Sequence, residues 1–393
     1  MIQKYPYPYK AWFTIANDPD NTLIKDWREL NSFIWKDLKL PLANSLFLKS
    51  YNHNLPNQVN LNDYPEILSQ KHDIIHTWGD YMHSRKNGFD RQDAVEACDM
   101  LLKHSINPRV WIDHSKFIGN LLHSSNKGSI PHTFDGSGIK YTNYVYSLDL
   151  IKKAGIRYIW DGKITNIVGQ DRKISSYEYF KLECSSRFNT IIKTILNKIV
   201  KSKKLRKKLR INKPENKQYY TYLFPDGNKL YCFTRYGNWK DSDIYGLGNI
   251  ISPKKIDELI SNQSTMVVYT HLGKRPKSKK EKHFHIPEAT KKSLKNVSEK
   301  FKSKQLMVSP LSIMLDYLVL RDNIKLFPKK NLIEFCSDGI RYNQIQQSDL
   351  NGKKFSFNNN FFDLENIQVI SNGKSLKFNI KIENENKIFS IIF

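Results

Sequence analysis

The chain has 393 residues, of which 39% are hydrophobic and 12% aromatic, so it can bury a substantial core in one large domain with an appendage or in two or three smaller ones. The net charge of +25 is concentrated in two stretches: residues 196–213 carry nine Lys or Arg and no acid, and residues 274–304 carry twelve against three Glu. The remainder is only mildly basic, which argues against a surface built throughout for nucleic acid.

The four cysteines are widely spaced and form no Cys-x-x-Cys pair, so we expect reduced thiols rather than disulfides or a cysteine zinc site. The N-terminal stretch MIQKYPYPYKAWF lacks the apolar region of a signal peptide, and no apolar run approaches the length of a membrane span. These features predict a cytoplasmic protein.

Short apolar, β-branched runs alternate with helix-like stretches along most of the chain. The runs lie at residues 11–16, 44–50, 72–78, 107–115, 156–162, 229–237 and 264–274, and the helix-like stretches at 23–38, 91–105, 144–155 and 252–263. This alternation is typical of parallel βα units with buried strands. About seven such units in a row predict an α/β fold of the (β/α) barrel type.

Two segments interrupt this pattern. Residues 187–211 place apolar side chains at helical spacing and end in a basic run, which predicts either a surface helix with a solvated charged face or a helix that binds an anionic membrane or polyanion. From about residue 329, short alternating runs are divided by Asn/Gly turns, with a hairpin expected around Asn384–Asn386. We therefore predict a barrel at 1–169 and 226–325, a basic helical insertion at 170–225, and a C-terminal β module at 326–393.

Polar side chains recur at the carboxyl ends of the predicted strands. Asn, Asp and Pro also suit a simple turn, but the carboxyl ends of barrel strands are where catalytic residues converge. The repeated placement therefore favours a site. Its candidate residues are Asp18, Asp20, His76, Asp113, His114, Asp161 and His271.

The stretch His76-Thr-Trp-Gly-Asp80 places a His and a carboxylate four residues apart, directly after a strand. If a helical turn begins there, both side chains can point at one ion. With Asp20 they would form a three-ligand site with open positions for water, as in catalytic metal centres. His83 and His114 are competitors for the place of Asp80.

The order of these features resembles that of the polysaccharide deacetylase (NodB-homology) family of metal-dependent carbohydrate esterases. The matching stretches are Thr14 to Asp20 with its paired acids, His76 to Asp80, the strand with Arg109, Tyr158-Ile-Trp-Asp161, and Val267 to Leu272 with His271. Pro19 separates the two acids, and Asp80 stands where the family has a second His. The resemblance covers roughly residues 8–320 apart from the insertion.

The resemblance implies a hydrolase acting on C–N bonds other than peptide bonds, with a divalent metal, zinc before cobalt, nickel or manganese. It implies that Asp20, His76 and Asp80 hold the metal and that Asp18 is the base, kept ionised by Arg109. His271 would protonate the leaving amine, with Asp161 orienting its imidazole. Trp78, Trp111 and Trp160 are expected near the same rim, where their rings could stack on a sugar. Asp113 and His114 are unusual for the family, and we expect either a hydrogen-bonded loop pair or extra metal or substrate contacts there.

The substrate expected from these features is an N-acetylated amino sugar of bacterial surface polysaccharide biosynthesis, nucleotide- or lipid-linked because no signal peptide is expected. Residues 187–213 could then hold the enzyme at the inner membrane. One alternative is a glycosyltransferase with an Asp-x-Asp metal site at Asp18 and Asp20. A second is a non-catalytic protein that binds polyanions or a membrane surface, although the basic stretches lack the interleaved aromatic side chains of nucleic-acid platforms.

Overall fold

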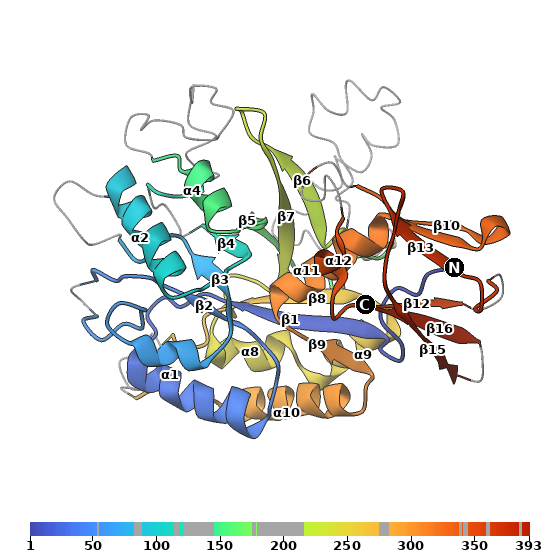
Figure 1. Cartoon of the computed structure of the whole chain (residues 1–393). Helices are drawn as coiled ribbons and strands as arrows, with labels where there is room; N and C mark the ends of the chain where they lie inside the picture. The colour runs from blue at the N-terminus through green and yellow to red at the C-terminus, as the bar shows by residue number, and fades with distance from the viewer. Residues whose placement is uncertain are drawn as a thin grey trace, which may run out of the picture.

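The computed structural model shows a mixed α/β protein in which one large curled sheet is flanked by helices and joined to two small sheets (Figure 1). The residues that the structure describes are 1–52, 55–81, 89–113, 118–121, 145–174, 178, 216–274, 283–337, 340, 345–358, 362–384 and 387–393.

The large sheet has nine strands, in the spatial order β2-β3-β4-β5-β7-β8-β1-β9 with β6 attached to β7. Every pair along the path is parallel, and β6 alone runs antiparallel to its partner. The strands are β1 (Ala11–Asn17), β2 (Asn44–Leu46), β3 (His72–His76), β4 (Val110–Ile112), β5 (Tyr158–Thr165), β6 (Tyr219–Leu223), β7 (Lys229–Tyr236), β8 (Thr265–Thr270) and β9 (Leu306–Val308). All seven predicted strands are present, as the alternation of short apolar runs and helices indicated.

The sheet curls into an open half-barrel, which corrects the expectation of a closed barrel. Between β7 and β8 the only paired position is Tyr236 with Val268, because β6 occupies the same edge of β7 from Lys229 to Phe233. Between β1 and β2, hydrogen bonds from side chains take the place of a backbone ladder. The Asn17 side chain donates to that of Asn44 at 2.7 Å, and the Ser45 hydroxyl donates to the Asn17 carbonyl. The end strand β2 therefore lies beside the end of β1 without a backbone hydrogen-bond ladder between them.

Most of the helices cover the convex side of the sheet. They are α1 (Ile24–Leu30), the wider turns of η1 (Asn31–Asp37), α2 (Arg91–Lys103), α4 (Leu148–Lys153), α8 (Ile244–Ile250), α9 (Pro253–Ser261) and α10 (Glu288–Lys302), together with the short 3-10 turn η2 (Pro65–Ser69). Apolar side chains of α2 and α4 pack against Ile75, Trp111 and Ile159, and those of α8 and α10 pack against Ile15 and Val268.

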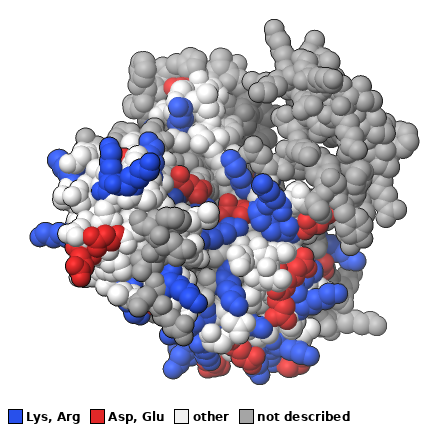
Figure 2. Space-filling view, turned by 90° about the vertical axis from the view of Figure 1, so that its right-hand side faces the viewer, with Lys and Arg blue, Asp and Glu red and all other residues white. Residues whose placement is uncertain are grey.

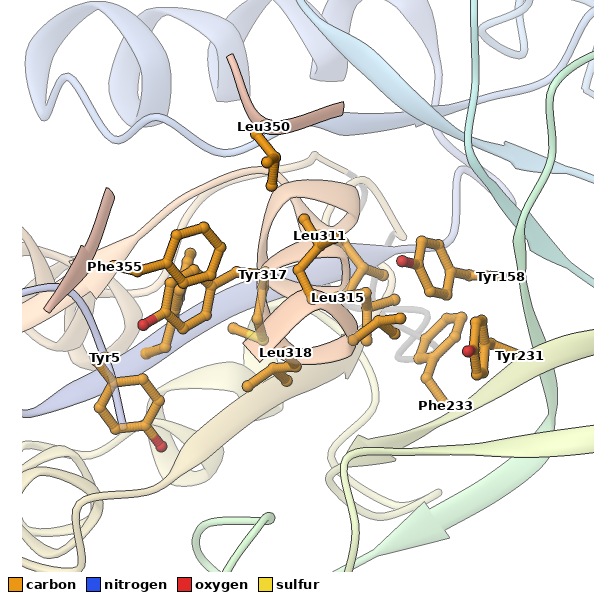
Figure 3. Packing of buried hydrophobic residues seen from close by; sticks show 14 of the residues in the cluster. Tyr5, Tyr158, Tyr231, Phe233, Leu311, Leu315, Tyr317, Leu318, Leu350 and Phe355 are labelled. Carbon is orange, nitrogen blue, oxygen red and sulfur yellow. The ribbon is translucent and has the colours of Figure 1, made fainter. Parts of the chain in front are cut away.

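Helix α11 (Leu311–Asp322) fills the concave side of the half-barrel. It is buried around most of its circumference, as its nearly continuous run of apolar residues requires. Figure 3 shows Leu311 and Leu315 facing Tyr158 and Phe233 of the large sheet, while Tyr317 lies against Phe355 of the C-terminal part. This helix joins the barrel and the C-terminal strands into one hydrophobic core.

The C-terminal part forms two small sheets. One has the order β10-β11-β13-β14 and the other the order β12-β16-β15. Their elements are β10 (Ile324–Phe327), η3 (Pro328–Lys330), β11 (Leu332–Phe335), α12 (Gln347–Leu350), β12 (Lys354–Asn358), β13 (Gln368–Ser371), β14 (Lys374–Ser375), β15 (Asn379–Glu383) and β16 (Ile388–Ile392). The antiparallel pair of β15 and β16 confirms the predicted terminal hairpin. On the face that Figure 2 shows, basic and acidic side chains of the described residues are interspersed.

Most of the predicted insertion, including residues 187–213, lies outside the described residues. Its last part is described from residue 216 on, and there β6 belongs to the large sheet. Among the described residues, no helix is both long enough and apolar enough to cross a membrane.

Candidate metal centre

Strand alternation decides which side chains enter the concave side of the half-barrel. Ala16, Phe233 and Tyr269 lie in the inner core, whereas their neighbours Ile15, Cys232 and Val268 pack against the outer helices. Successive side chains of a strand point to opposite faces. The residues two positions further on, Asp18, Arg235 and His271, therefore continue the inward set at the carboxyl ends of β1, β7 and β8.

Two carboxylates and two imidazoles meet at this rim. The Nε2 atom of His76 lies 3.0 Å from Asp20 Oδ2 and 3.9 Å from Asp18 Oδ2. His271 Nε2 lies 3.6 Å from the same Asp20 oxygen and 3.9 Å from the same Asp18 oxygen. Asp18, Asp20 and His271 have the spacing of a group that could hold a metal ion.

The outer nitrogens of both rings face backbone carbonyls. His76 Nδ1 lies 3.2 Å from the carbonyl oxygen of Ile112, and His271 Nδ1 lies 2.7 Å from that of Ser242. A neutral imidazole carries one proton, and a carbonyl can only accept. In its neutral form each ring would carry its proton on Nδ1, and its Nε2 lone pair would face the carboxylates.

Lone pairs directed at carboxylates repel unless a cation lies among them or the rings are protonated. A backbone carbonyl that fixes the Nδ1–H tautomer is the usual partner of a metal-binding His. Two imidazoles with an Asp carboxylate are also a donor set that suits Zn²⁺ and similar divalent ions. The residues present fit a divalent metal centre.

Arg235 is a charged residue of this centre that the sequence did not single out. It is fully buried, and its guanidinium donates to both oxygens of Asp18, at 2.6 and 3.1 Å. The guanidinium carbon also lies 3.4 Å from the ring centre of Trp160 and 4.4 Å from that of Tyr269. The sequence feature that could have identified Arg235 is its position near the end of the apolar strand Lys229–Tyr236. A buried Arg requires a partner for its charge.

Arg109, expected to hold Asp18, does not contact it. Its Nη1 donates to Asp316 Oδ2 at 2.6 Å, and the second oxygen of Asp316 accepts from Tyr158 at 2.7 Å. Arg109 precedes Val110 at the amino end of β4, whereas the candidate centre lies at the carboxyl ends of the strands. The opposite end of the strand is too far away for this contact.

Asp80 lies outside the group formed by Asp18, Asp20 and the two His. The expected helical turn after His76 does not form, because Thr77 adopts φ +54° and Gly79 φ +147°. Left-handed φ is uncommon for a β-branched residue and often marks a functional site. Asp80 Oδ2 instead accepts from Gln58 Nε2 at 2.7 Å, and Gln58 Oε1 accepts from the backbone N–H of Asn21 at 3.2 Å. Asp80 thus supports the turn that carries Asp20.

Asp161 does not orient His271. The ladder of β5 with β7 is irregular between Trp160 and Ile164, where Gly162 has φ +88°. This bulge leaves Asp161 exposed, with its carboxylate accepting from the Lys163 N–H and the Tyr220 hydroxyl. The carbonyl of Ser242 takes the orienting role next to His271.

The three predicted tryptophans are buried. Trp78 and Trp111 pack edge to face in the outer core, 5.1 Å between ring centres, because their positions face the helices. They therefore cannot stack on a sugar at the concave rim. Trp160 is on the concave side, but it packs on Arg235 and is only 6% exposed.

Asp113 Oδ1 accepts from the indole N–H of Trp111 at 2.6 Å and from the backbone N–H of Leu121 at 3.0 Å. These contacts tie Asp113 to Trp111 and Leu121. His83 and His114 lie outside the described residues.

Trp239 is the exposed aromatic residue next to the centre. It is 66% exposed and contacts Tyr269 edge to face, at 5.3 Å between ring centres. Tyr269 in turn lies 5.4 Å from the ring of His271. Burial and the negative charge of Asp18 raise the pKa of Tyr269 well above its usual value, so it stays a neutral phenol.

Comparison of the chain with protein-family models, with curated proteins and with solved structures finds no match. The chemistry of the centre's own residues therefore carries the functional assignment.

Proposed function

We propose that the chain is a metal-dependent hydrolase that removes an N-acetyl or related acyl group from an amino sugar. The observation that carries this proposal is the meeting of Asp20, His76 and His271 beside Asp18, whose carboxylate is held by the buried Arg235. The centre offers donors for a cation and a separate carboxylate, that of Asp18, next to one another.

Asp20, His76 and His271 are the proposed ligands. Their Oδ2 and Nε2 atoms face one another, and the tautomer of each His is set by a backbone carbonyl. Zinc suits two neutral imidazoles and one carboxylate best, with cobalt, nickel or manganese as substitutes. When bound, such an ion supplies Lewis-acid activation of a water and of the scissile carbonyl. In this proposal His271 is a metal ligand and not the proton donor that the sequence resemblance implied.

Asp18 is the proposed base. The two hydrogen bonds from Arg235 fix the orientation of its carboxylate. The carboxylate takes a proton from the attacking water and then delivers it to the leaving amine nitrogen. The Asp18 side chain therefore ends the reaction in the protonation state in which it began.

An amino sugar is the proposed substrate. It is supported by the order of motifs along the chain, which resembles that of polysaccharide deacetylases, and by the exposed ring of Trp239 near His271. Aromatic faces pack well against the apolar face of a sugar ring. A nucleotide- or lipid-linked saccharide of surface polysaccharide biosynthesis is the proposed substrate class.

Release of acetate from a panel of free, nucleotide-linked and lipid-linked N-acetyl amino sugars tests the proposal. We expect release that stops after chelation and returns with zinc or cobalt, and that Asp18→Asn abolishes. A protein that binds the metal stoichiometrically but releases acetate from none of these substrates would overturn the assignment of substrate while leaving the metal centre intact.

A further inference from the structure

A second polar pocket lies at the opposite end of the large sheet from the candidate metal centre. Its volume is about 600 Å³, in the range of small-molecule sites. It is lined at the amino ends of β5 and β7, by Arg157 just before β5, by the β6–β7 turn, and by Lys152 of α4. The β6–β7 hairpin points to the top of Figure 1, beside α4.

The charges in this pocket have one sign. Lys152, Arg157 and Lys229 line it, and no acid is among the described lining residues. Asp316, a carboxylate that interacts electrostatically with Arg157, is already engaged by Arg109 at 2.6 Å and Tyr158 at 2.7 Å. Three cationic side chains therefore line the described part of this pocket.

Two hydrogen-bond donors at the pocket lack partners among the described residues. One is Nη1 of Arg157 and the other is the amide nitrogen of Asn228, and both atoms are buried. Lys152 donates to Oδ1 of Asn228, which fixes the amide so that its NH₂ end is the unpaired one. A buried donor without a partner is costly, so such groups usually have an acceptor that belongs to a ligand.

We propose that this pocket binds the phosphate group of a small phosphorylated molecule. Arg157 and Asn228 donate to the phosphate oxygens, and Lys152 and Lys229 add positive charge from the rim. Ile156, Leu230 and Tyr231 supply an apolar wall for the rest of the ligand.

The pocket is a separate site. Lys229 begins β7 and Arg235 lies six residues further along it, so the two sites are roughly 20 Å apart at about 3.3 Å per residue. A ligand here acts as an effector or anchor, and the inference does not depend on the reaction at the metal centre.

Isothermal titration calorimetry of the full chain tests the proposal, with a hexose phosphate, the unphosphorylated hexose and inorganic phosphate as probes. We expect the hexose phosphate to bind with an affinity that falls with salt, and the neutral hexose not to bind. Equal binding of inorganic phosphate would identify the free anion as the ligand of the same site. Absence of binding by both phosphates would overturn the proposal.

Variants locate the binding. Arg157→Gln should weaken it by roughly tenfold or more, because a charge-assisted hydrogen bond is lost. Lys152→Gln should weaken it by a smaller factor, and because Lys152 is exposed this variant remains informative if Arg157→Gln does not fold. Lys153→Gln is the matched control, since Lys153 neighbours Lys152 in α4 but pairs with Asp99. Binding that is unchanged in Lys152→Gln and in folded Arg157→Gln would place the phosphate elsewhere and overturn the assignment.

Discussion

The guanidinium of Arg235 holds both carboxylate oxygens of Asp18, and no part of its side chain is exposed to solvent. A Lys at this position would keep the charge but could not donate two parallel hydrogen bonds. We therefore expect Arg235→Lys to retain the metal and to lose turnover by roughly 10²-fold or more, as for a misplaced base. Steady-state kinetics with metal analysis of the same sample measures both.

Arg109→Lys is the matched control for this variant. Arg109 lies at the amino end of β4, away from the candidate centre, and donates to Asp316 of α11. The turnover of Arg109→Lys should therefore stay close to that of the unmodified protein. A loss of turnover in Arg109→Lys with none in Arg235→Lys would restore the role that the sequence assigned to Arg109.

Metal content separates the proposed ligands from Asp80. Asp20→Asn and His76→Gln each remove one donor of the centre and should lower metal occupancy strongly, with the fold retained by circular dichroism. Asp80→Asn keeps an oxygen that can accept from Gln58 and should retain the metal. Asp18→Asn should also retain it while losing turnover by about 10²–10⁴-fold. Loss of metal in Asp18→Asn would instead identify Asp18 as a ligand.

Trp239 should contribute to substrate binding and not to the chemical step. We expect Trp239→Ala to raise KM several-fold with a small change in kcat, because a stacking face is removed while Arg235 and His271 stay in place. Leu223→Ala is a suitable control, since Leu223 is also exposed, at 62%, but lies on β6. A fall in kcat alone would show that Trp239 acts on the centre and not on the substrate.

Asp73 makes the stability of the fold depend on pH. Its carboxylate is buried and accepts from the Ser312 N–H at 2.7 Å, while its Oδ1 has no partner among the described residues. Burial raises the pKa of Asp73 above its usual value, so the folded protein holds the proton more tightly than the unfolded chain. The contribution of Asp73 to the free energy of unfolding therefore falls as pH rises from the usual Asp value to the raised one.

Asp73→Asn removes this titration and leaves an oxygen to accept from Ser312. Urea denaturation at about pH 4 and about pH 7 gives the free energy of unfolding of both proteins. The difference, variant minus unmodified protein, should increase as pH rises. Asp99→Asn, at an exposed pair with Lys153, should follow the unmodified protein at both values. Parallel pH profiles for Asp73→Asn and the unmodified protein would contradict the prediction.

Residues 187–213 remain a sequence-based proposal for membrane binding. Each basic residue near an anionic surface contributes about 1 kcal/mol, and the attraction falls with salt. The chain should sediment with anionic vesicles at low salt, and deletion of 187–213 should release it without affecting hydrolysis of a small substrate. Equal sedimentation with anionic and neutral vesicles would exclude this role.

The sequence by itself determined the parallel βα pattern, its strand positions and the carboxyl-end location of Asp18, Asp20, His76 and His271. These follow from short-range rules: apolar runs predict strands, and alternate residues of a strand share a face. The same alternation could have shown that Trp78 and Trp111 face outward and that Arg235 faces inward.

Only the tertiary structure decided which partners meet. Arg235 pairs with Asp18 across 217 positions because β7, β8 and β1 are neighbours in the sheet, an order that local periodicity does not contain. The left-handed Thr77 and the bulge at Gly162 likewise redirected Asp80 and Asp161. Such local departures are stabilised by contacts between distant segments, and for that reason the ligand set depended on the folded chain.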